Sequence, residues 1–465
     1  MPTPCDAIVI GSGQAGPFLA AKLAAAGRQT VLIEREHLGG TCVNDGCIPT
    51  KTMVASARAA HIARRAADFG VQFAGPVQVD MRAVKARKDR IVGESVDNLT
   101  QWLTNMPKMR LLWGHARFTG PHEVQVGDET LQAPQIFVNT GGRAVLPDWP
   151  GIEQVPVLNN TSMMSLEELP DLMIVVGASY IGLEFAQMMR RFGSRVTVLE
   201  QAERAILRED PEVSREVQAI LEREGVVFHL GVRGAKVSLA DGGTRIRVAL
   251  NSGRVAHEVE GSHLLAAVGR RPNTDDLGLE RAGIATDSRG FITVDEQLRT
   301  NVPGVWALGD CNGRGAFTHT SYNDHEIVAA NVLDGAARRV GDRIPAYALF
   351  TDPPLGRVGM SEAEVRASGR KALVGVMPMT RVGRARERGE TQGFMKVLVD
   401  ARTERILGAA LLCIEGDEIV HSLLDAMYCG ASFNVLRNAV HIHPTVSELI
   451  PTLLANLKPL EETTP

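Results

Sequence analysis

The sequence predicts an α/β protein built from two Rossmann-like domains and a C-terminal α+β domain. Its 465 residues correspond to roughly three domains of ordinary size. An internal repeat accounts for the first two domains, because residues 7–34 align without gaps on residues 173–200. Strand and helix patterns beyond residue 346 account for the third domain.

Each copy of the repeat has the pattern of a βαβ unit. It reads as a buried strand, a glycine turn, a helix, a glycine stop and a second buried strand that ends in an acid. The matched positions are Gly11 and Gly177, Gly16 and Gly182, Gly27 and Gly193, and Glu34 and Glu200. The copies differ at the middle glycine of the turn, where Gly13 of the first copy is replaced by Ser179 in the second.

The repeated unit predicts two binding sites for adenosine-containing ligands. Unpaired N–H groups and the helix dipole favour a pyrophosphate at the helix start, and the closing acid accepts hydrogen bonds from ribose hydroxyls. A tight strand-to-helix turn without a ligand is the simpler alternative for one copy, and the second matched acid argues against it. Ser179 must point away from the pyrophosphate for binding to persist.

Composition and charge exclude several classes of protein. The net charge is −4, with 44% hydrophobic and 22% charged residues, so a nucleic-acid partner is not expected. The apolar stretch from residue 7 to 27 is interrupted by glycines and polar residues, and we expect it to be soluble structure rather than a membrane span or signal peptide. Four of the six cysteines are scattered singly. This usage favours a cytoplasmic protein over a disulfide-stapled one.

The close pair Cys42 and Cys47 is the main chemical signal. Positions i and i+5 of a regular helix point about 140° apart, so bonding them requires an irregular turn, which Gly46 permits. Pro49 suits the first turn of a helix that begins near Cys47, and the dipole of that helix would lower a thiol pKa. A zinc site would need two more ligands, and none lies nearby in the sequence. Redox chemistry and coincidence both remain open from the spacing alone.

The residues around this pair resemble a known signature. The run Gly39-Gly40-Thr41-Cys42-Val43-Asn44-Asp45-Gly46-Cys47-Ile48-Pro49-Thr50-Lys51 is similar to the redox-active segment of the pyridine nucleotide-disulfide oxidoreductases, a flavoprotein family that includes lipoamide dehydrogenase, glutathione reductase and mercuric reductase. Residues 140–143, 267–273 and 300–310 resemble further family segments, so the resemblance covers nearly the whole chain.

The resemblance implies two cofactors and a domain layout. FAD would contact Gly11, Gly13, Gly16, Glu34, Arg35, Gly40, Thr41, Lys51, Thr140, Gly141 and Asp310. NAD(P)H would contact Gly177, Tyr180, Ile181, Gly182, Glu200 and Gly269. The implied domains are an FAD-binding domain in two parts, 1–150 and 271–345, an NAD(P)-binding domain, 151–270, and a dimerisation domain, 346–465. A carboxylate at Glu200 would repel a 2′-phosphate, which favours NADH over NADPH. Arg204 and Arg208 lie just downstream and would weaken this preference if they faced the cofactor. Arginines at such positions are more commonly solvated on the surface.

The resemblance also implies catalytic roles. Cys47 would receive electrons from the flavin, and Cys42 would attack the outside substrate. Lys51 and Glu184 resemble the ion pair beside the flavin, and Tyr180 resembles the aromatic gate over the nicotinamide site. The ordinary alternatives are a solvated lysine, a glutamate on a helix face and a core tyrosine.

A C-terminal segment, residues 441–448, resembles the acid/base segment of the family. His443 would move a proton to and from Cys42, and Glu448 would orient it. In the family this histidine reaches the other subunit's site, so it implies a homodimer. We also expect Thr445 and Glu448 to form a capping box at a helix start. Ser361 and Glu364 predict another, for a helix that ends at Gly369, and residues 394–399 and 406–412 predict a hairpin.

The substrate stays open at this stage. The last cysteine is Cys429, so the C-terminal cysteine pair of mercuric reductases is missing, and His443 favours a disulfide substrate. Residues 317–322 and 350–360 are closer to a mercuric-reductase-like branch, which keeps reduction of Hg²⁺ or Cu²⁺ as an alternative. A non-enzymatic flavin-binding sensor is the third hypothesis. Asp45 would oppose thiolate formation if buried. The arginines at 381, 384, 386 and 388 either attract an anionic substrate or belong to a surface loop.

Overall fold

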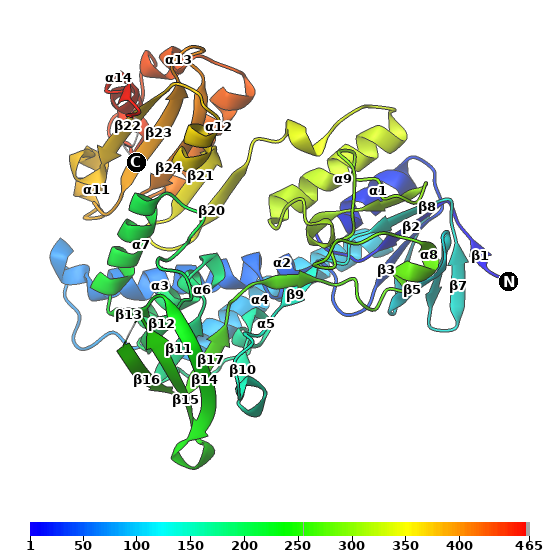
Figure 1. Ribbon diagram of the computed structural model, residues 1–465, viewed down its shortest axis with the longest axis horizontal. Helices are drawn as coiled ribbons and strands as arrows, with labels where there is room; N and C mark the ends of the chain where they lie inside the picture. The colour runs from blue at the N-terminus through cyan, green and yellow to red at the C-terminus, as the bar shows by residue number, and fades with distance from the viewer. Residues whose placement is uncertain (254, 462–465) are drawn as a thin grey trace.

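The computed structural model describes residues 1–253 and 255–461 and divides into three lobes (Figure 1). The N-terminal lobe lies at the right of the view, the second lobe lies below, and the terminal lobe lies at the upper left. The predicted α/β fold class with a C-terminal α+β domain is confirmed. Residues 462–465, the end of the predicted terminal domain, lie outside the described residues. Within the described ranges no helix has the length and apolar character needed to cross a membrane.

The first lobe is organised by a parallel five-stranded sheet. Its strands in spatial order are β19 (Val305–Ala307), β8 (Gln135–Val138), β2 (Ala7–Ile10), β3 (Thr30–Glu34) and β4 (Met109–Trp113). The first copy of the repeat forms β2, α1 (Gly16–Ala25) and β3 as the pattern predicts. Strand β19 follows the second repeat in the chain, so the chain returns to complete the first sheet.

The second lobe repeats this arrangement. Its parallel sheet has the order β10 (Val157–Leu158), β17 (His263–Ala266), β11 (Leu172–Val176), β12 (Arg195–Leu199) and β13 (Val226–His229). The second copy of the repeat forms β11, α6 (Tyr180–Phe192) and β12. Every residue of β2 and all but the first of β11 are buried, which agrees with strands covered on both faces of a parallel sheet.

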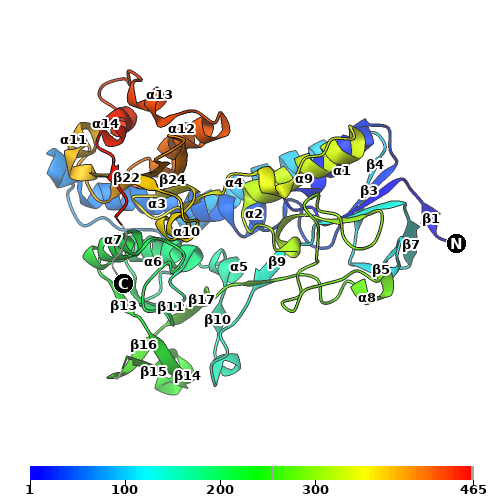
Figure 2. The ribbon, with the colours of Figure 1, turned by 45° about the horizontal axis from the view of Figure 1, so that its top comes forward.

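Smaller sheets and helices surround the two parallel sheets. The smaller sheets contain β1 (Thr3–Pro4), β5 (Ala116–Gly120), β6 (Glu123–Val126) and β7 (Glu129–Gln132); β14 (Val232–Ala240), β15 (Arg245–Ser252) and β16 (Val255–Gly261); and β9 (Gly142–Ala144) with β18 (Arg270–Pro272). The helices are α2 (Gly40–Asn44), α3 (Cys47–Arg64), α4 (Met81–Thr104), α5 (Asn160–Met163), α7 (Pro211–Arg223), α8 (Leu279–Ala282) and α9 (Thr318–Leu333). Helix α3 packs against α4 and α6, so the helix that begins at Cys47 lies between the lobes (Figure 2).

The terminal lobe is an antiparallel sheet with helices. Its strand order is β20 (Ala346–Leu349), β21 (Leu355–Gly359), β24 (Ile406–Leu412), β23 (Phe394–Asp400), β22 (Ala372–Pro378) and β25 (Lys458–Pro459). Its helices are α10 (Glu362–Ala367), α11 (Gly383–Glu387), α12 (Gly416–Tyr428), α13 (Phe433–Arg437) and α14 (Ile450–Ala455). Strands β23 and β24 form the expected hairpin, and Ser361 with Glu364 forms the expected capping box.

The predicted capping box at Thr445 is wrong. A short 3₁₀ turn covers Ser447–Leu449, and α14 begins only at Ile450. The Thr445 hydroxyl donates instead to the backbone carbonyl of Ile442, 2.8 Å away. Glu448 turns toward His443, so its carboxylate is not available for a helix start.

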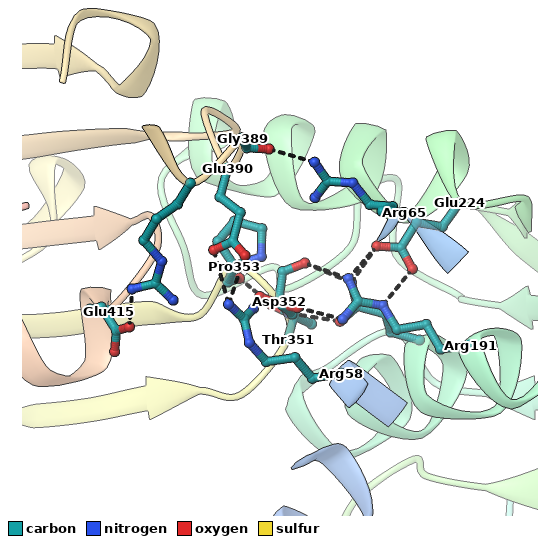
Figure 3. Close-up of polar contacts among 12 residues, drawn as sticks. Arg58, Arg65, Arg191, Glu224, Thr351, Asp352, Pro353, Gly389, Glu390 and Glu415 are labelled. Carbon is teal, nitrogen blue, oxygen red and sulfur yellow. Dashed lines mark hydrogen bonds and ion pairs between the residues drawn. The ribbon is translucent and has the colours of Figure 1, made fainter. Parts of the chain in front are cut away.

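A partly buried ion-pair network joins the three lobes (Figure 3). Asp352, on the connection between β20 and β21, pairs with Arg58 of α3 and with Arg191 of α6. Arg191 also pairs with Glu224 at 2.7 Å, and Arg58 pairs with Glu390 at 2.8 Å. The Arg191 side chain is only 5% exposed, so its charge depends on these partners.

Candidate active site

One large cavity lies where the lobes meet. Its volume is about 1620 Å³, above the roughly 300–1,000 Å³ of a typical small-molecule pocket, so it has room for more than one ligand. Both glycine turns and the Cys42–Cys47 segment line it. Of the predicted site residues, the wall includes Gly11, Gly13, Glu34, Arg35, Gly40, Thr41, Cys42, Cys47, Lys51, Thr140, Gly141, Gly177, Tyr180, Ile181, Glu184, Glu200, Gly269 and Asp310.

Gly16 and Gly182 are not on the cavity wall. A Cβ atom on Gly16 would lie 2.0 Å from the carbonyl oxygen of Gly11, and one on Gly182 would lie 2.0 Å from that of Gly177. These two glycines therefore allow each helix to approach the turn before it, which is a packing role within the same motif.

The two closing acids make equivalent contacts. The Glu34 carboxylate accepts hydrogen bonds from the backbone N–H of Ser12 at 3.0 Å and of Arg35 at 2.7 Å. The Glu200 carboxylate accepts from Ala178 N–H at 2.6 Å and Ala202 N–H at 2.8 Å. Each carboxylate is thus held by its own glycine turn and by the backbone just after it. This geometry repeats in both lobes and presents one charged acid at each strand end.

An irregular turn brings the two thiols together, as expected from the spacing. Helix α2 ends at Asn44, α3 begins at Cys47, and a Cβ on Gly46 would lie 2.8 Å from the Thr41 carbonyl oxygen. The structure holds both cysteines as free thiols. The Cys47 Sγ lies 3.0 Å from the Thr318 Oγ1.

The thiol pair is electrostatically asymmetric. A hydrogen bond from Cys42 is the main cause that lowers the pKa of Cys47, to about 6, and Thr318 and Lys51 act in the same direction. The same hydrogen bond between the two thiols, together with burial, raises the pKa of Cys42. The first proton to leave the pair therefore comes from Cys47, which gives a thiolate at pH 7.

Lys51 and Glu184 meet beside this thiolate. Lys51 Nζ lies 2.7 Å from Glu184 Oε2, and the Glu184 side chain is 6% exposed. The other carboxylate oxygen, Oε1, accepts from the Phe350 N–H at 3.0 Å, and the lysine ammonium lies 4.6 Å from the centre of the Phe350 ring. The pair joins α3 to α6 at the level of the cysteines.

Comparison with known proteins places these features in a family. The model of the pyridine nucleotide-disulphide oxidoreductases matches residues 5–324, and that of their dimerisation domain matches residues 345–454. The chain belongs to the pyridine nucleotide-disulphide oxidoreductase family. It is therefore an oxidoreductase of a family that uses FAD and NAD(P)H, with a dimerisation domain at its C-terminal end.

Several relatives match over nearly their full length. The chain is 37% identical to the probable pyridine nucleotide-disulfide oxidoreductase RclA of Escherichia coli, with 97% of this chain and 99% of the relative covered. It is 34% identical to a mercuric reductase of Streptomyces lividans, with 96% and 94% covered. The structure described as the Cu(II) complex of HOCl-induced flavoprotein disulfide reductase RclA from Escherichia coli matches with a TM-score of 0.89, 35% identity, and coverage of 97% and 99%.

The first lobe fits the FAD of this family. Thr140 and Arg270 line the cavity, and the hydroxyl of Thr140 and the Nε atom of Arg270 are buried without a hydrogen-bond partner among the described residues. Asp310 lies next to Arg270, with Oδ2 at 3.8 Å from Arg270 Nε, and burial raises the pKa of its carboxyl. Polar groups that lack protein partners are suited to the phosphates and hydroxyls of a dinucleotide.

His443 and Glu448 lie away from this cavity. The His443 Nδ1 is 2.7 Å from Glu448 Oε2, and the histidine side chain is 79% exposed. Neither residue lines the cavity of the same chain. The expected orientation of the imidazole by the carboxylate is present, and its ring is available to a second molecule.

Two contacts at the site were missed by sequence reasoning. Thr318 and Phe350 were noted only as parts of branch motifs, because each lies far along the chain from the cysteine or ion pair that it contacts. Asp45, between the two cysteines, is half-buried, and this burial raises the pKa of its carboxyl. The arginines at 384 and 388 pair with Glu387 and Glu415, as in an ordinary surface segment.

Proposed function

We propose that this protein is a reductase that transfers two electrons from NAD(P)H through FAD and the Cys42–Cys47 pair to a small disulfide. The observation that carries this function is the asymmetric thiol pair, with Cys47 held by Thr318 and Lys51 where the two nucleotide-binding turns converge. In the balanced reaction, NAD(P)H, one proton and one disulfide become NAD(P)⁺ and two thiols. Bound FAD would supply the two-electron relay between the nicotinamide and the cysteine pair.

Residues of the chain itself would carry out the remaining steps of disulfide reduction. Lys51, held by Glu184, keeps a positive charge beside Cys47 and stabilises its thiolate. Cys42 attacks one sulfur of the substrate and forms a mixed disulfide, from which the first thiol leaves. Cys47 then attacks Cys42, which re-forms the internal disulfide and releases the second thiol. A base is needed to remove the proton of Cys42, because the hydrogen bond between the two thiols and burial raise the pKa of Cys42.

We assign that base to His443 of a second subunit in a homodimer. The histidine is exposed on the lobe that matches the dimerisation domain, is oriented by Glu448 and does not line its own cavity. Val440 and Ile442, beside it, are 99% and 79% exposed, which supports an apolar contact between subunits. The proton that leaves Cys42 would pass to this imidazole and then to the leaving thiol.

We further propose that NADH is preferred and that the protein works in the cytoplasm. The Glu200 carboxylate, held by two backbone N–H groups, would repel a 2′-phosphate. Arg208 also lines the cavity and would reduce this preference. Four of the six cysteines are scattered singly along the chain, which suits a reducing compartment.

Anaerobic titration of the purified yellow protein with NADH tests the function. We expect a two-electron-reduced form with a long-wavelength charge-transfer band from the Cys47 thiolate to the flavin. The Cys47→Ser variant should lack the band, whereas Cys42→Ser should keep it. Retention of the band in Cys47→Ser, or the absence of flavin from the purified protein, would contradict the proposal.

Reduction of Hg²⁺ or Cu²⁺ at the same cysteines is the second candidate. It is favoured by the similarity to a mercuric reductase and to an RclA structure described as a Cu(II) complex. The described residues contain no group of three or more histidine, cysteine or acidic side chains suited to hold a metal ion. Steady-state NADH oxidation with a panel of disulfides and with each ion separates the two candidates. Turnover with an ion but with no disulfide would replace the first proposal by the second.

A further inference from the structure

Two tyrosines and one buried carboxylate meet at the edge of the cavity. Tyr180 is the first residue of α6, Tyr347 lies in β20, and Glu209 precedes α7. The Tyr180 hydroxyl donates to Glu209 Oε1 at 3.2 Å, and the Tyr347 hydroxyl donates to the same oxygen at 2.6 Å. Among the described residues, these phenols are the only hydrogen-bond donors to that carboxylate.

The carboxylate has little else to stabilise it. The Glu209 side chain is 0% exposed, and its second oxygen, Oε2, has no hydrogen-bond partner in the described chain. The nearest cation is Arg357, with Nη1 3.5 Å from Oε2, and this guanidinium is shared with Asp210 at 3.2 Å. Removing one donor from a buried carboxylate costs more than breaking an exposed hydrogen bond, because no water replaces it.

The Tyr180 ring lies on the path between the second glycine turn and the thiols. Tyr180 follows that turn directly, and Glu184, one helical turn later on the same face of α6, pairs with Lys51. The ring lines the cavity and packs edge-on against Tyr347 and Phe317, with centroid distances of 5.6 and 6.3 Å. A nicotinamide that ran from the turn toward Lys51 would meet this ring, which lines the same cavity.

We propose that Glu209 and Tyr347 are positioning residues that form a latch on Tyr180 and thereby set the affinity of the protein for the nicotinamide half of its dinucleotide. This inference rests on the proposed function, because it takes the second glycine turn to bind NAD(P)H. When the ring swings aside, its hydroxyl leaves Glu209, and Tyr347 alone then donates to the carboxylate. The fraction of open molecules, and with it the apparent affinity, depends on how well the carboxylate tolerates that loss.

The two phenols have opposite effects on the latch. In Tyr180→Phe the ring remains but is no longer held, so the open form becomes more populated and binding tightens. In Tyr347→Phe the carboxylate keeps Tyr180 as its only phenol donor, so opening becomes more costly and binding weakens. Burial raises the pKa of both phenols, so both remain protonated donors at neutral pH. A general loosening of the fold would move both variants in the same direction.

Titration calorimetry of the oxidised holoprotein with NAD⁺ and with ADP-ribose tests the latch. ADP-ribose lacks the nicotinamide ring, so it fills the turn without displacing Tyr180. We expect Tyr180→Phe to lower the dissociation constant of NAD⁺ about tenfold, as for the loss of one charge-assisted hydrogen bond, and Tyr347→Phe to raise it. The dissociation constant of ADP-ribose should be unchanged in both variants. Tyr322→Phe, at a partly exposed tyrosine of α9 that packs on Phe18, is the matched control and should change neither constant.

The possible outcomes distinguish a failure of the latch from a failure of the proposed function. Shifts of NAD⁺ binding in the same direction in both variants, or equal shifts for ADP-ribose, would overturn the latch while the function stands. Wild-type protein that binds neither NAD⁺ nor ADP-ribose would instead overturn the proposed function. In stopped-flow reduction by NADH, the latch predicts that the half-saturating NADH concentration follows the same order as the NAD⁺ constants.

Discussion

The Thr318 hydroxyl lies 3.0 Å from the sulfur of Cys47, although 271 positions separate the two residues in the chain. Thr318 is also the first residue of α9, so the start of a long helix faces the thiol. A hydroxyl donor and a helix N-terminus both favour a negative charge on sulfur. Helix α9 therefore both stabilises the Cys47 thiolate and forms part of the first lobe.

Replacing Thr318 by Val should weaken the thiolate without changing the shape of the site. The pKa of Cys47 should rise by about one unit, because a hydrogen bond to a charged group is lost. The charge-transfer absorbance of the NADH-reduced protein, followed against pH, measures this shift. Thr318→Ser keeps the hydroxyl and should restore the wild-type midpoint. An unchanged midpoint in Thr318→Val would show that the hydroxyl does not stabilise the thiolate.

The wild-type protein should lose this absorbance in acid. The pKa of Cys47 is lowered to about 6, so the thiolate dominates above that pH and is protonated below it. The band should thus be full at pH 7.5 and should fade as the pH falls through about 6. Lys51→Met removes a cation that lowers the pKa of Cys47, so its midpoint should move to higher pH. A midpoint near the ordinary thiol pKa of about 8.5 in the wild type would contradict the asymmetry of the pair.

His443→Ala should separate the two half-reactions. We expect flavin reduction by NADH to stay normal and disulfide turnover to fall about 10²- to 10⁴-fold, as for the loss of a general acid–base. Heterodimers that combine one His443→Ala subunit with one Cys42→Ser subunit give the sharper result. If the histidine serves the partner, one of their two sites has Cys42 together with a partner His443, so mixed dimers regain about half of the wild-type activity. Inactive mixed dimers would place the histidine in its own subunit's site.

The sequence was sufficient for features that depend on local spacing. The glycine turns, their closing acids and the Cys42–Cys47 turn follow from backbone geometry over short segments, so all of them could be predicted. The Ser361 capping box was predicted for the same reason. The equivalent expectation at Thr445 failed because Glu448 hydrogen-bonds to His443, a contact that competes for the same carboxylate.

Contacts between distant segments could not be predicted in this way. Thr318 and Phe350 lack any pattern that connects them with Cys47 or Glu184, because the packing of α9 and β20 on the first two lobes brings them there. Glu209 lies in a loop of ordinary composition, and nothing local distinguishes it from a solvated acid. Its complete burial between two tyrosines results from the packing of the terminal lobe on the second lobe.

Glu200→Gln should shift the choice of nicotinamide cofactor. The Ala178 and Ala202 N–H groups donate to different oxygens of the carboxylate, so the single amide oxygen can still accept from one of them, and the negative charge that opposes a 2′-phosphate is removed. We expect kcat/KM for NADPH to rise roughly tenfold relative to NADH, as for the removal of one repulsion of about 1.4 kcal/mol. Steady-state assays with both cofactors and one acceptor measure the ratio. An unchanged ratio would show that the charge of Glu200 does not set the choice between the two cofactors.

Asp352→Ala should destabilise the protein strongly, because it removes the carboxylate shared by two arginines from different lobes (Figure 3). Arg191, 5% exposed, would keep only Glu224 as an ion-pair partner, and the helices α3 and α6 would lose the carboxylate that both contact. Breaking a buried pair in this way typically costs about 3–5 kcal/mol, which urea unfolding of the holoprotein should detect. The matched control is Glu94→Ala, which removes an exposed partner of Arg90 on α4 and should cost about 0.5 kcal/mol or less. Equal losses in the two variants would mean that the network contributes no more than a surface pair. Because α3 carries Lys51 and α6 carries Glu184, a weakened network should also lower the rate of flavin reduction by NADH in the folded variant.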